Sequence, residues 1–404
     1  MRDISRSLKY IKRRGYYPEL PVVNSAPEPK VIVNGKKVLM FASNNYFNLL
    51  HDPRVIDASI EGTKKWGIGS GSSRLFSGNL EIHEHLEKAI ADFKNREAGL
   101  TFVSGWMANE GCIPALINVL EPKSMLMGLK DKKYSQDSII FSDEFNHASI
   151  ITGCQLSKAE KVIFKHNDIS DLKDKISRYP IKQRKMIIIE GIYSMDGDIG
   201  RLDQVLEVAK FYRALVYLDD AHATGILGKT GRGTEEYFSC DGQVDIIMGT
   251  FTKVFGGVGG FIVGSQDLID YLRITSRTFI FSAPIPPPVV CGLLKSIEIV
   301  DRDAATRNRI KDNARFLRET LVENNFDICG SQSHIVPVLI GEEAKAIKFS
   351  KLLLDRGLFV PTARFPAVPK GMARLRFTIS SAHTIDQISF LVDSLVEVRN
   401  QLPL

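Results

Sequence analysis

Over the first two-thirds of the chain, short apolar runs alternate with segments in which apolar residues recur at helical spacing. The apolar runs lie at 100–103, 138–141, 185–189, 215–218, 244–248 and 261–263. Helical spacing is clear from Gly105 to residue 117 and again at 205–212. Short continuous apolar strands separated by helices are typical of a buried, mostly parallel sheet with helices on both faces. The pattern therefore predicts an α/β fold.

The two ends of the chain follow different patterns. Apolar stretches at 31–33 and 38–41 flank Asn34-Gly35, which predicts a hairpin with a tight turn; helices are expected at 53–66 and 82–93, with a Gly/Ser-rich loop at 67–78 between them. After the prolines of 284–288 we expect long charged helices over 289–325, then strand 335–339, helix 344–355, strand 375–379 and helix 385–398. We predict an N-terminal segment (1–45), a large domain (46–288) and a small α+β domain (289–404).

The composition narrows the class of protein. A chain of 404 residues is too long for one ordinary core, and 44% hydrophobic with 25% charged residues is usual for a soluble globular protein. The net charge of +6 comes without an aromatic–basic pattern, so we expect no nucleic-acid partner but some affinity for anionic substrates. No run approaches the roughly 20 apolar residues of a membrane helix. The five scattered cysteines have no CxxC spacing, which favours a reducing cytoplasm over a disulfide framework or a zinc site.

Polar residues follow several of the predicted strands. In open α/β sheets, ligands bind beyond the carboxyl ends of the strands. Four groups fall there: Ser104-Gly105, Glu190 with Tyr193-Ser194, Asp219 to His222, and Thr250 to Lys253. Because they follow different strands of one sheet, a single crevice can hold them all.

Lys253 and Asp219 are the most informative of these residues, although neither is decisive alone. A lysine at a dry strand end has its pKa lowered and becomes a usable nucleophile, but spacing alone modestly favours a surface lysine beside the glycines of 256–260. A buried Asp219 needs a cationic or donor partner. A pyridinium nitrogen is one such partner, and a helix N-cap or a metal ligand is the alternative.

The remaining signals are weaker on their own. His147 has a flat ring that can stack on an aromatic group, but a lone loop histidine is usually surface. Ser104-Gly105-Trp106 opens a helix, and helix N-termini bind phosphate. Arg374 and Arg376 share one face of a strand, either toward solvent or in a cleft where a guanidinium can bind a carboxylate. The other histidines show no constellation and are interpreted as structural: His51, His83, His85, His166 and His334.

Read together, five motifs resemble those of the α-oxoamine synthases, which are pyridoxal-phosphate-dependent acyltransferases of fold type I. The motifs are SDEFNHASI (142–150), EGIYSMDGDIG (190–200), VYLDDAHATGILGKTGRG (216–233), GTFTKVFGGVGGF (249–261) and FPAVPKGMARLRFTISSAH (365–383). The resemblance runs in the family's motif order from about residue 31 to 398. It implies the fold type I architecture, with a mostly parallel sheet in a large domain, and a homodimer whose active sites lie at the subunit interface.

The resemblance also implies roles, residue by residue. Lys253 matches the lysine that holds the cofactor as a Schiff base and acts as the catalytic base, and Asp219 matches the partner of the pyridine nitrogen. His222 matches the histidine near the cofactor's phenolic oxygen, and His147 the one that stacks on its ring. Asn44 matches a substrate-side asparagine. Arg376 matches the arginine that holds the amino-acid carboxylate. Ser282 matches a residue that reaches the cofactor's phosphate from the second subunit. The other matches contact the cofactor or its phosphate: Gly105, Trp106, Glu190, Ser194 and Thr250.

The activity implied is condensation of a small amino acid (glycine, alanine or serine) with an acyl-CoA, releasing CoA and CO2 and leaving an α-amino ketone. Within the family the motifs do not separate a long-chain, serine palmitoyltransferase-like condensation from a 2-amino-3-ketobutyrate CoA ligase that retains the carboxylate. Outside it, an aminotransferase of the same fold and a non-catalytic partner subunit remain open, although the presence of Lys253 argues against the latter. Three departures from the family pattern are Ser282-Ala283, Tyr46-Phe47-Asn48-Leu49 and an insertion at 121–137 whose Met125-Leu126-Met127 could line an acyl channel.

Overall fold

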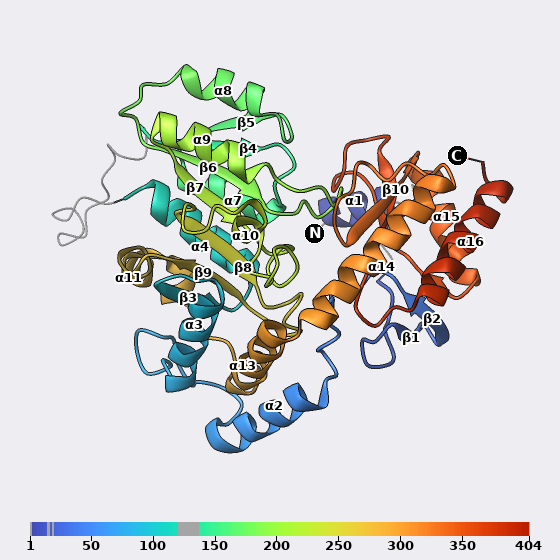
Figure 1. The fold of residues 1–404 in the computed structure, drawn as a ribbon, viewed down its shortest axis with the longest axis horizontal. Helices are drawn as coiled ribbons and strands as arrows, with labels where there is room; N and C mark the ends of the chain where they lie inside the picture. Colours follow the sequence, from blue (N-terminus) through green and yellow to red (C-terminus); the bar gives the residue numbers. More distant parts are fainter. Residues whose placement is uncertain (1, 14–16, 18–19, 120–136, 404) are drawn as a thin grey trace.

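The computed structural model describes residues 2–13, 17, 20–119 and 137–403, and its centre is a seven-stranded sheet (Figure 1). The strand order is β3-β9-β8-β7-β6-β4-β5. Only β9 runs antiparallel to its neighbours. The bounds are β3 Ala98–Phe102, β4 Ile139–Asp143, β5 Glu160–Phe164, β6 Lys185–Glu190, β7 Leu215–Asp219, β8 Ile246–Thr250 and β9 Gly260–Gly264. The expected α/β fold with a mostly parallel sheet is confirmed.

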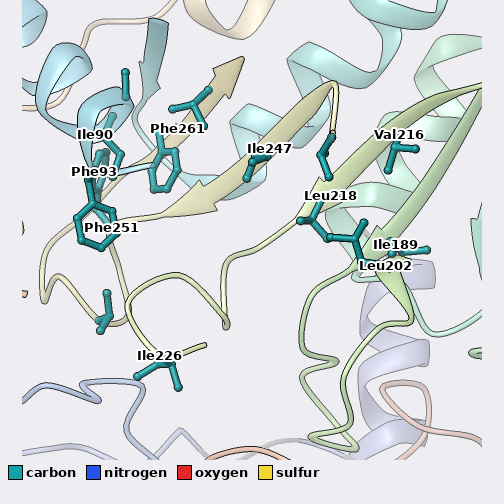
Figure 2. Packing of buried hydrophobic residues seen from close by; sticks show 14 of the residues in the cluster. Ile90, Phe93, Ile189, Leu202, Val216, Leu218, Ile226, Ile247, Phe251 and Phe261 are labelled. Carbon is teal, nitrogen blue, oxygen red and sulfur yellow. The ribbon is translucent and has the colours of Figure 1, made fainter. Parts of the chain in front are cut away.

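Both faces of this sheet are buried, because successive residues of each strand point to opposite sides. On one face Ile189, Leu218 and Ile247 pack with the helices α3 and α9 (Figure 2). On the other, Ile188, Tyr217 and Ile246 pack with α4, α7 and α11. The helices of this part are α2 Pro53–Trp66, α3 Glu81–Phe93, α4 Gly105–Ile117, α7 Ala148–Ser157, α8 Ile169–Ser177, α9 Leu202–Tyr212, α10 Thr234–Phe238, α11 Gln266–Thr275, α12 Arg277–Ile280 and α13 Pro287–Arg302.

A second core forms around a smaller antiparallel sheet of order β10-β13-β12. Its strands are β10 Ile335–Gly341, β12 Thr362–Ala363 and β13 Ala373–Thr378. Helices α14 Ala304–Glu323, α15 Glu343–Asp355 and α16 Ile385–Gln401 cover it (Figure 1). By contrast, α13 contributes to the first core and contacts α2 and α3, so the change of packing partner falls between α13 and α14.

The N-terminal strands pair with the C-terminal part of the chain. Strands β1 Lys30–Val33 and β2 Lys36–Met40 form the expected hairpin, and Asn34 (φ 48°) and Gly35 (φ 78°) make its turn. Strand β11 Leu358–Phe359 then adds to β2 in parallel. Beyond β2, Phe41 accepts a hydrogen bond from Thr378 N at 2.8 Å, and Tyr46 accepts one from Ser381 N at 2.8 Å. This pairing holds the 41–46 segment at the junction of the two cores.

Most of the predicted elements are present within one to three residues of their expected bounds, whereas helices α7, α8, α10, α11 and α12 and strands β5, β11 and β12 were not predicted. Helix α1 Arg2–Arg13 precedes the hairpin. The proposed acyl-channel residues at 125–127 lie outside the described residues. Among the helices that the structure describes, none is both long and apolar enough to cross a bilayer.

Candidate active site

The carboxyl ends of three neighbouring strands meet at one edge of the large sheet. Glu190, Asp219 and Thr250 are the last residues of β6, β7 and β8. The parallel register pairs Glu190 directly with Asp219. Lys253 follows β8 by three residues, so the strand order alone brings these side chains to one place. The convergence expected from the sequence is therefore present.

Lys253 is an unpaired amine in this crevice. Its side chain is half-buried, and within the described ranges Nζ has no hydrogen-bond or ion-pair partner. Burial lowers the pKa of Lys253 to about 8, the carboxylates of Asp219 and Glu190 oppose that effect, and Arg376 adds to it. The unprotonated amine that a nucleophile or base requires is therefore far more populated near neutral pH than in an ordinary lysine.

The two adjacent aspartates have different tasks. Asp220 pairs with the buried Lys94 at 2.7 Å and accepts from Thr234 Oγ1 at 2.5 Å. Asp219 has no ion-pair partner among the described residues, and it accepts hydrogen bonds from Asn109 Nδ2 at 2.9 Å and Ala221 N at 3.1 Å. Asp219 is 5% exposed. It is thus the carboxylate held in place and still able to accept a cationic partner.

His147 and Glu190 are joined through the backbone. The N–H of His147 donates to Glu190 Oε1 at 2.5 Å, and Nδ1 of His147 lies 2.7 Å from Ser149 Oγ. Burial and the nearby Asp219 raise the pKa of Glu190 well above its usual range. Burial and Lys253 lower the pKa of His147, while Asp219 opposes them. The His147 side chain keeps an exposed surface, on which a flat ring can stack.

A hydrogen-bonded chain runs from Arg376 to His222 through Tyr46. The guanidinium of Arg376 donates to Tyr46, whose hydroxyl lies 2.7 Å from His222 Nδ1 and 3.2 Å from Asn44 Oδ1. An arginine can only donate, so the hydroxyl proton of Tyr46 is free for the shorter contact, and His222 then carries its own proton on Nε2. Burial, reinforced by Lys253 and Arg376, lowers the pKa of His222 well below its usual range. His222 is therefore a neutral donor.

The two strand arginines are also distinguished. Arg374 is 2% exposed and forms an ion pair with Asp196. Arg376 donates from Nε to the backbone oxygen of Ser194 at 2.5 Å and has no carboxylate partner in the described chain. Its remaining donors are available for a carboxylate from outside, while Ser194 contributes its carbonyl rather than its hydroxyl.

The start of α4 is a close-packed backbone site. Ser104 caps the helix by accepting from Met107 N at 3.1 Å, which leaves the first N–H groups of the helix without an intrahelical partner. A Cβ on Gly105 would approach Met248 Cε to 2.9 Å, and one on Gly260 would approach Gly105 Cα to 2.6 Å. Trp106 lies edge-on to His147, with ring centroids 6.2 Å apart. Such a helix start binds phosphate.

Three residues that the sequence analysis gave no role belong to this site or border it: Tyr46, Asn109 and His334. Asn109 lies one helical turn after Gly105. Because residues four apart share one face of a helix, its spacing from the predicted phosphate-binding turn could have identified it as a site residue. Tyr46 lies two residues after Asn44 in the chain, but its contact with His222 joins residues 176 apart. Ser282 is the one predicted site residue that does not join the cluster within this chain; it bonds to Ala283 O at 3.1 Å.

The family model for aminotransferases of class I and II matches residues 36–395, and the chain belongs to this family. It is 40% identical to the 8-amino-7-oxononanoate synthase of Thermoanaerobacter pseudethanolicus over 99% of this chain and 97% of that protein. It is 39% identical to the protein of the same name from Alkaliphilus oremlandii over 99% and 98%. Within the family these relatives and the motifs identify the chain as an α-oxoamine synthase.

Solved structures agree on the fold. The serine palmitoyltransferase of Sphingomonas wittichii superposes with a TM-score of 0.90 at 31% identity, covering 98% of this chain and 96% of the other. The 8-amino-7-oxononanoate synthase of Francisella tularensis has a TM-score of 0.75 at 27% identity, covering 90% and 98%. A serine palmitoyltransferase described with pyridoxal phosphate as an internal aldimine has a TM-score of 0.90 at 32% identity, covering 99% and 97%. The fold is fold type I.

The side chains present here fit pyridoxal phosphate. Lys253 offers an unpaired amine and Asp219 a carboxylate without a cationic partner among the described residues. His222 offers a neutral Nε2–H donor, and His147 an exposed ring. A phosphate fits the start of α4, where a Cβ on Gly105 would approach Met248 Cε to 2.9 Å and Thr250 Oγ1 to 3.4 Å. No group of three or more His, Cys, Asp or Glu side chains in the described part could hold a metal ion.

Proposed function

We propose that this protein catalyses the decarboxylative condensation of a small amino acid with an acyl-CoA thioester, with pyridoxal phosphate as cofactor. The products are an α-amino ketone, free CoA and CO2. The observation that carries the proposal is Lys253, an unpaired amine with a lowered pKa, between the carboxylates Asp219 and Glu190 and near Arg376. That combination supplies a cofactor attachment point, a base and a carboxylate-binding group in one crevice.

Each residue of the site has a part in this reaction. When bound, pyridoxal phosphate withdraws electrons from the amino acid's α-carbon. Arg376 fixes the substrate carboxylate, and its Nε bond to Ser194 O holds the guanidinium in place. Lys253 takes the proton from the α-carbon, which then bonds to the acyl carbonyl carbon as the C–S bond breaks and CoA leaves as a thiol. The bond from the α-carbon to the carboxylate then breaks, CO2 leaves, and a proton is returned to the α-carbon.

The remaining residues orient the cofactor and stabilise charge. Asp219, held by Asn109 and Ala221 N, pairs with the pyridine nitrogen. His222 donates from Nε2 to the cofactor's phenolic oxygen or to the oxygen that becomes negative in the condensation. His147 stacks on the ring. Asn44, whose Oδ1 lies 3.2 Å from Tyr46 Oη, is on the substrate side. Gly105, Trp106 and Thr250 form the phosphate end.

The first candidate substrate pair is alanine with a dicarboxylic acyl thioester. A product named 8-amino-7-oxononanoate, as in the relatives at 39–40% identity, has its amine and ketone on adjacent carbons and a carboxylate at the far end. Alanine that has lost CO2 supplies the carbon with the amine and its methyl group. The second candidate, serine with a long-chain acyl-CoA, is favoured by the superposition on serine palmitoyltransferase at a TM-score of 0.90.

We also propose a homodimer in the cytoplasm. Phe76 (86% exposed) and Phe281 (71% exposed) are large apolar side chains open to solvent in the single chain. They belong to neighbouring segments, because Arg74 lies over the ring of Phe279 at 5.1 Å. A second subunit there would cover them and bring Ser282 to the partner's site. All five cysteines are free, which suits a reducing compartment.

The test is a Lys253→Ala variant beside a Lys210→Ala control, an exposed lysine on α9. We expect Lys253→Ala to lose the visible absorption of lysine-bound cofactor and to lower turnover about 10³-fold or more, measured as CoA thiol release. Lys210→Ala should match the wild type. Wild-type turnover by Lys253→Ala would refute the assignment.

The same assay ranks the substrates. Release of CoA with alanine and a dicarboxylic acyl-CoA, but not with serine and palmitoyl-CoA, would select the first pair. The opposite pattern would select the second. Formation of a keto acid without release of CoA would instead make the protein an aminotransferase.

A further inference from the structure

A cavity of about 560 Å³ is lined by His334, whose ring stands edge-on to Tyr46, and by none of the residues assigned to the cofactor. One wall is α14 and the other is the 226–237 segment that follows β7. Apolar side chains of Ile226, Leu227 and Tyr237 line part of it. The proposed reaction uses none of these residues.

The α14 wall is strongly cationic. Lys311, Arg315 and Arg318 line the cavity together with Ala314. Their spacing of three, four and seven residues puts them on one face of the helix. Lys229 from the opposite wall adds a fourth positive charge, and Glu236 is the one carboxylate among the lining residues.

These charges are poorly compensated. Throughout the described ranges Lys229, Lys311 and Arg318 have no ion-pair partner; Lys311 Nζ donates to Gly228 O at 2.7 Å, and Arg318 donates to Ser333 O. Glu236 is already occupied by the N–H groups of Thr230 and Arg232, both at 2.8 Å. Burial lowers the pKa of Lys311 and of Arg318, and neighbouring arginines lower both further. An anion in the cavity would relieve this repulsion.

His334 provides a second, independent sign of a ligand. Its side chain lines the cavity and is 2% exposed, and neither ring nitrogen has a hydrogen-bond partner in the part of the chain that is described. Burial, with Arg376, Lys253 and Arg318, lowers its pKa to about 3, so the imidazole is neutral and has one N–H to donate. Buried polar groups without a partner are rare and point to a missing water, ion or ligand.

We propose that this cavity is a second binding site, separate from the cofactor site, for an organic molecule that carries a doubly charged oxyanion on an apolar or aromatic body. The oxyanion, a phosphate or a pair of carboxylates, contacts Lys311, Arg318 and Lys229. His334 donates to it, and the body packs on Leu227 and Tyr237. This inference does not depend on which reaction the cofactor site performs.

The site is also connected to the catalytic residues. The ring of His334 stands edge-on to Tyr46 with centroids 4.1 Å apart, and Tyr46 contacts His222 at 2.7 Å. A ligand that reorients His334 therefore acts on the residue that sets the proton position of His222. Occupancy of the cavity is expected to change turnover without competing with the amino acid.

The test is calorimetric titration of the cofactor-loaded protein with phenyl phosphate and, separately, phthalate. We expect saturable binding of at least one, weakened tenfold or more in Lys311→Met and in Arg318→Met. Arg309→Met removes the same charge from an exposed position of α14 outside the cavity and should bind like the wild type. Preference between the two probes identifies the oxyanion as phosphate or dicarboxylate.

Two further variants keep the test decisive if either α14 variant fails to fold. Lys229→Met changes an exposed loop residue, and His334→Phe keeps a ring against Tyr46; each should weaken binding several-fold. Addition of the bound probe should change kcat of the wild type, and the same change in Lys229→Met should require a several-fold higher probe concentration. Lack of saturable binding to the wild type, or equal weakening in Arg309→Met, would overturn the proposal.

Discussion

Tyr46 controls the proton position of His222 although no sequence pattern gave it that role. Its hydroxyl is the hydrogen-bond partner of His222 Nδ1, and its oxygen accepts from Arg376. Without that hydroxyl, His222 can place its proton on either nitrogen, and the tautomer with the proton on Nδ1 has no Nε2–H to donate. Tyr46 is thus a positioning residue rather than a catalytic one.

We predict that Tyr46→Phe lowers kcat about tenfold, the effect of losing one hydrogen bond worth about 1.4 kcal/mol. The KM for the amino acid should change less, because Arg376 and its bond to Ser194 O remain. Steady-state kinetics together with the visible spectrum of the cofactor would measure this. Tyr10→Phe, on the exposed helix α1, is the control. If Tyr46→Phe keeps the wild-type kcat but has an altered unfolding temperature, then Tyr46 contributes only packing and does not position His222.

The lowered pKa of Lys253 predicts how the cofactor-free protein takes up its cofactor. Only the unprotonated amine attacks the aldehyde, so the rate of cofactor uptake should rise with pH around a midpoint of about 8. Stopped-flow absorbance against pH measures that midpoint. A midpoint near the ordinary lysine value of 10.5 would mean that burial does not depress this pKa.

For single residues, the sequence identified those that stand in a family motif. It missed those whose role depends on contacts with residues distant in the chain. Lys253, Asp219 and His147 stand in motifs of the family, and each lies at the cluster. Asn109 and His334 gain their meaning from partners such as Asp219 and Tyr46, which are distant in the chain. A single sequence carries no record of such contacts.

Two elements near the site are held together by one charged histidine. His166 bridges Asp143 Oδ1 at 2.9 Å, at the end of β4, and Asp198 Oδ2 at 2.8 Å, in the turn that follows Ser194. Burial alone would lower the pKa of His166, but its hydrogen bonds with both carboxylates raise it to about 10. The imidazolium therefore fixes the loop carrying His147 against the turn that receives Arg376.

We predict that His166→Gln lowers the free energy of unfolding by about 3 kcal/mol at pH 6, because Asp143 is left buried without its counter-charge. The folded pKa lies above the unfolded one, so this contribution is fully present below about pH 6.5 and disappears as pH rises through about 10. Denaturant unfolding of the wild type and of His166→Gln across this pH range measures the difference between their free energies of unfolding. Lys253 titrates in the same way in both proteins, so its contribution cancels in that difference. The control is His51→Gln, at an exposed pair with Glu28. A difference independent of pH would exclude the charged bridge.

The sequence predicted the helices and strands correctly where whole strands are buried, and it failed where a strand is largely exposed. The interior strands read as continuous apolar runs, and β4, β6 and β8 are buried at every position. Strand β5 is at the edge of the sheet and is mostly exposed, and its sequence Glu160–Phe164 opens with two charged residues, so only its last three positions are apolar.

At the scale of the whole molecule, the exposed side chains of Phe76, in the 67–78 loop, and Phe281, directly after α12, make a specific prediction about assembly. The wild type should sediment at twice its chain mass of 45.1 kDa, and Phe281→Glu should shift it toward one chain with loss of turnover. Phe211→Glu, which changes a similarly exposed ring (69%) on α9, should leave the mass unchanged. A wild type that sediments as a single chain would exclude the dimer and the role of Ser282 across it.

The pairing of β2 with β11 also has a consequence for how the protein is made. The hairpin is synthesised early, yet Met40 pairs with Phe359, and Tyr46 is held by Ser381. Ribosomes add roughly 5–20 residues per second, so the intervening stretch takes on the order of tens of seconds to emerge. During that time the segment with Asn44 and Tyr46 has no partner strand. The part of the site that holds Asn44 and Tyr46 therefore cannot form until residues 358–381 have left the ribosome.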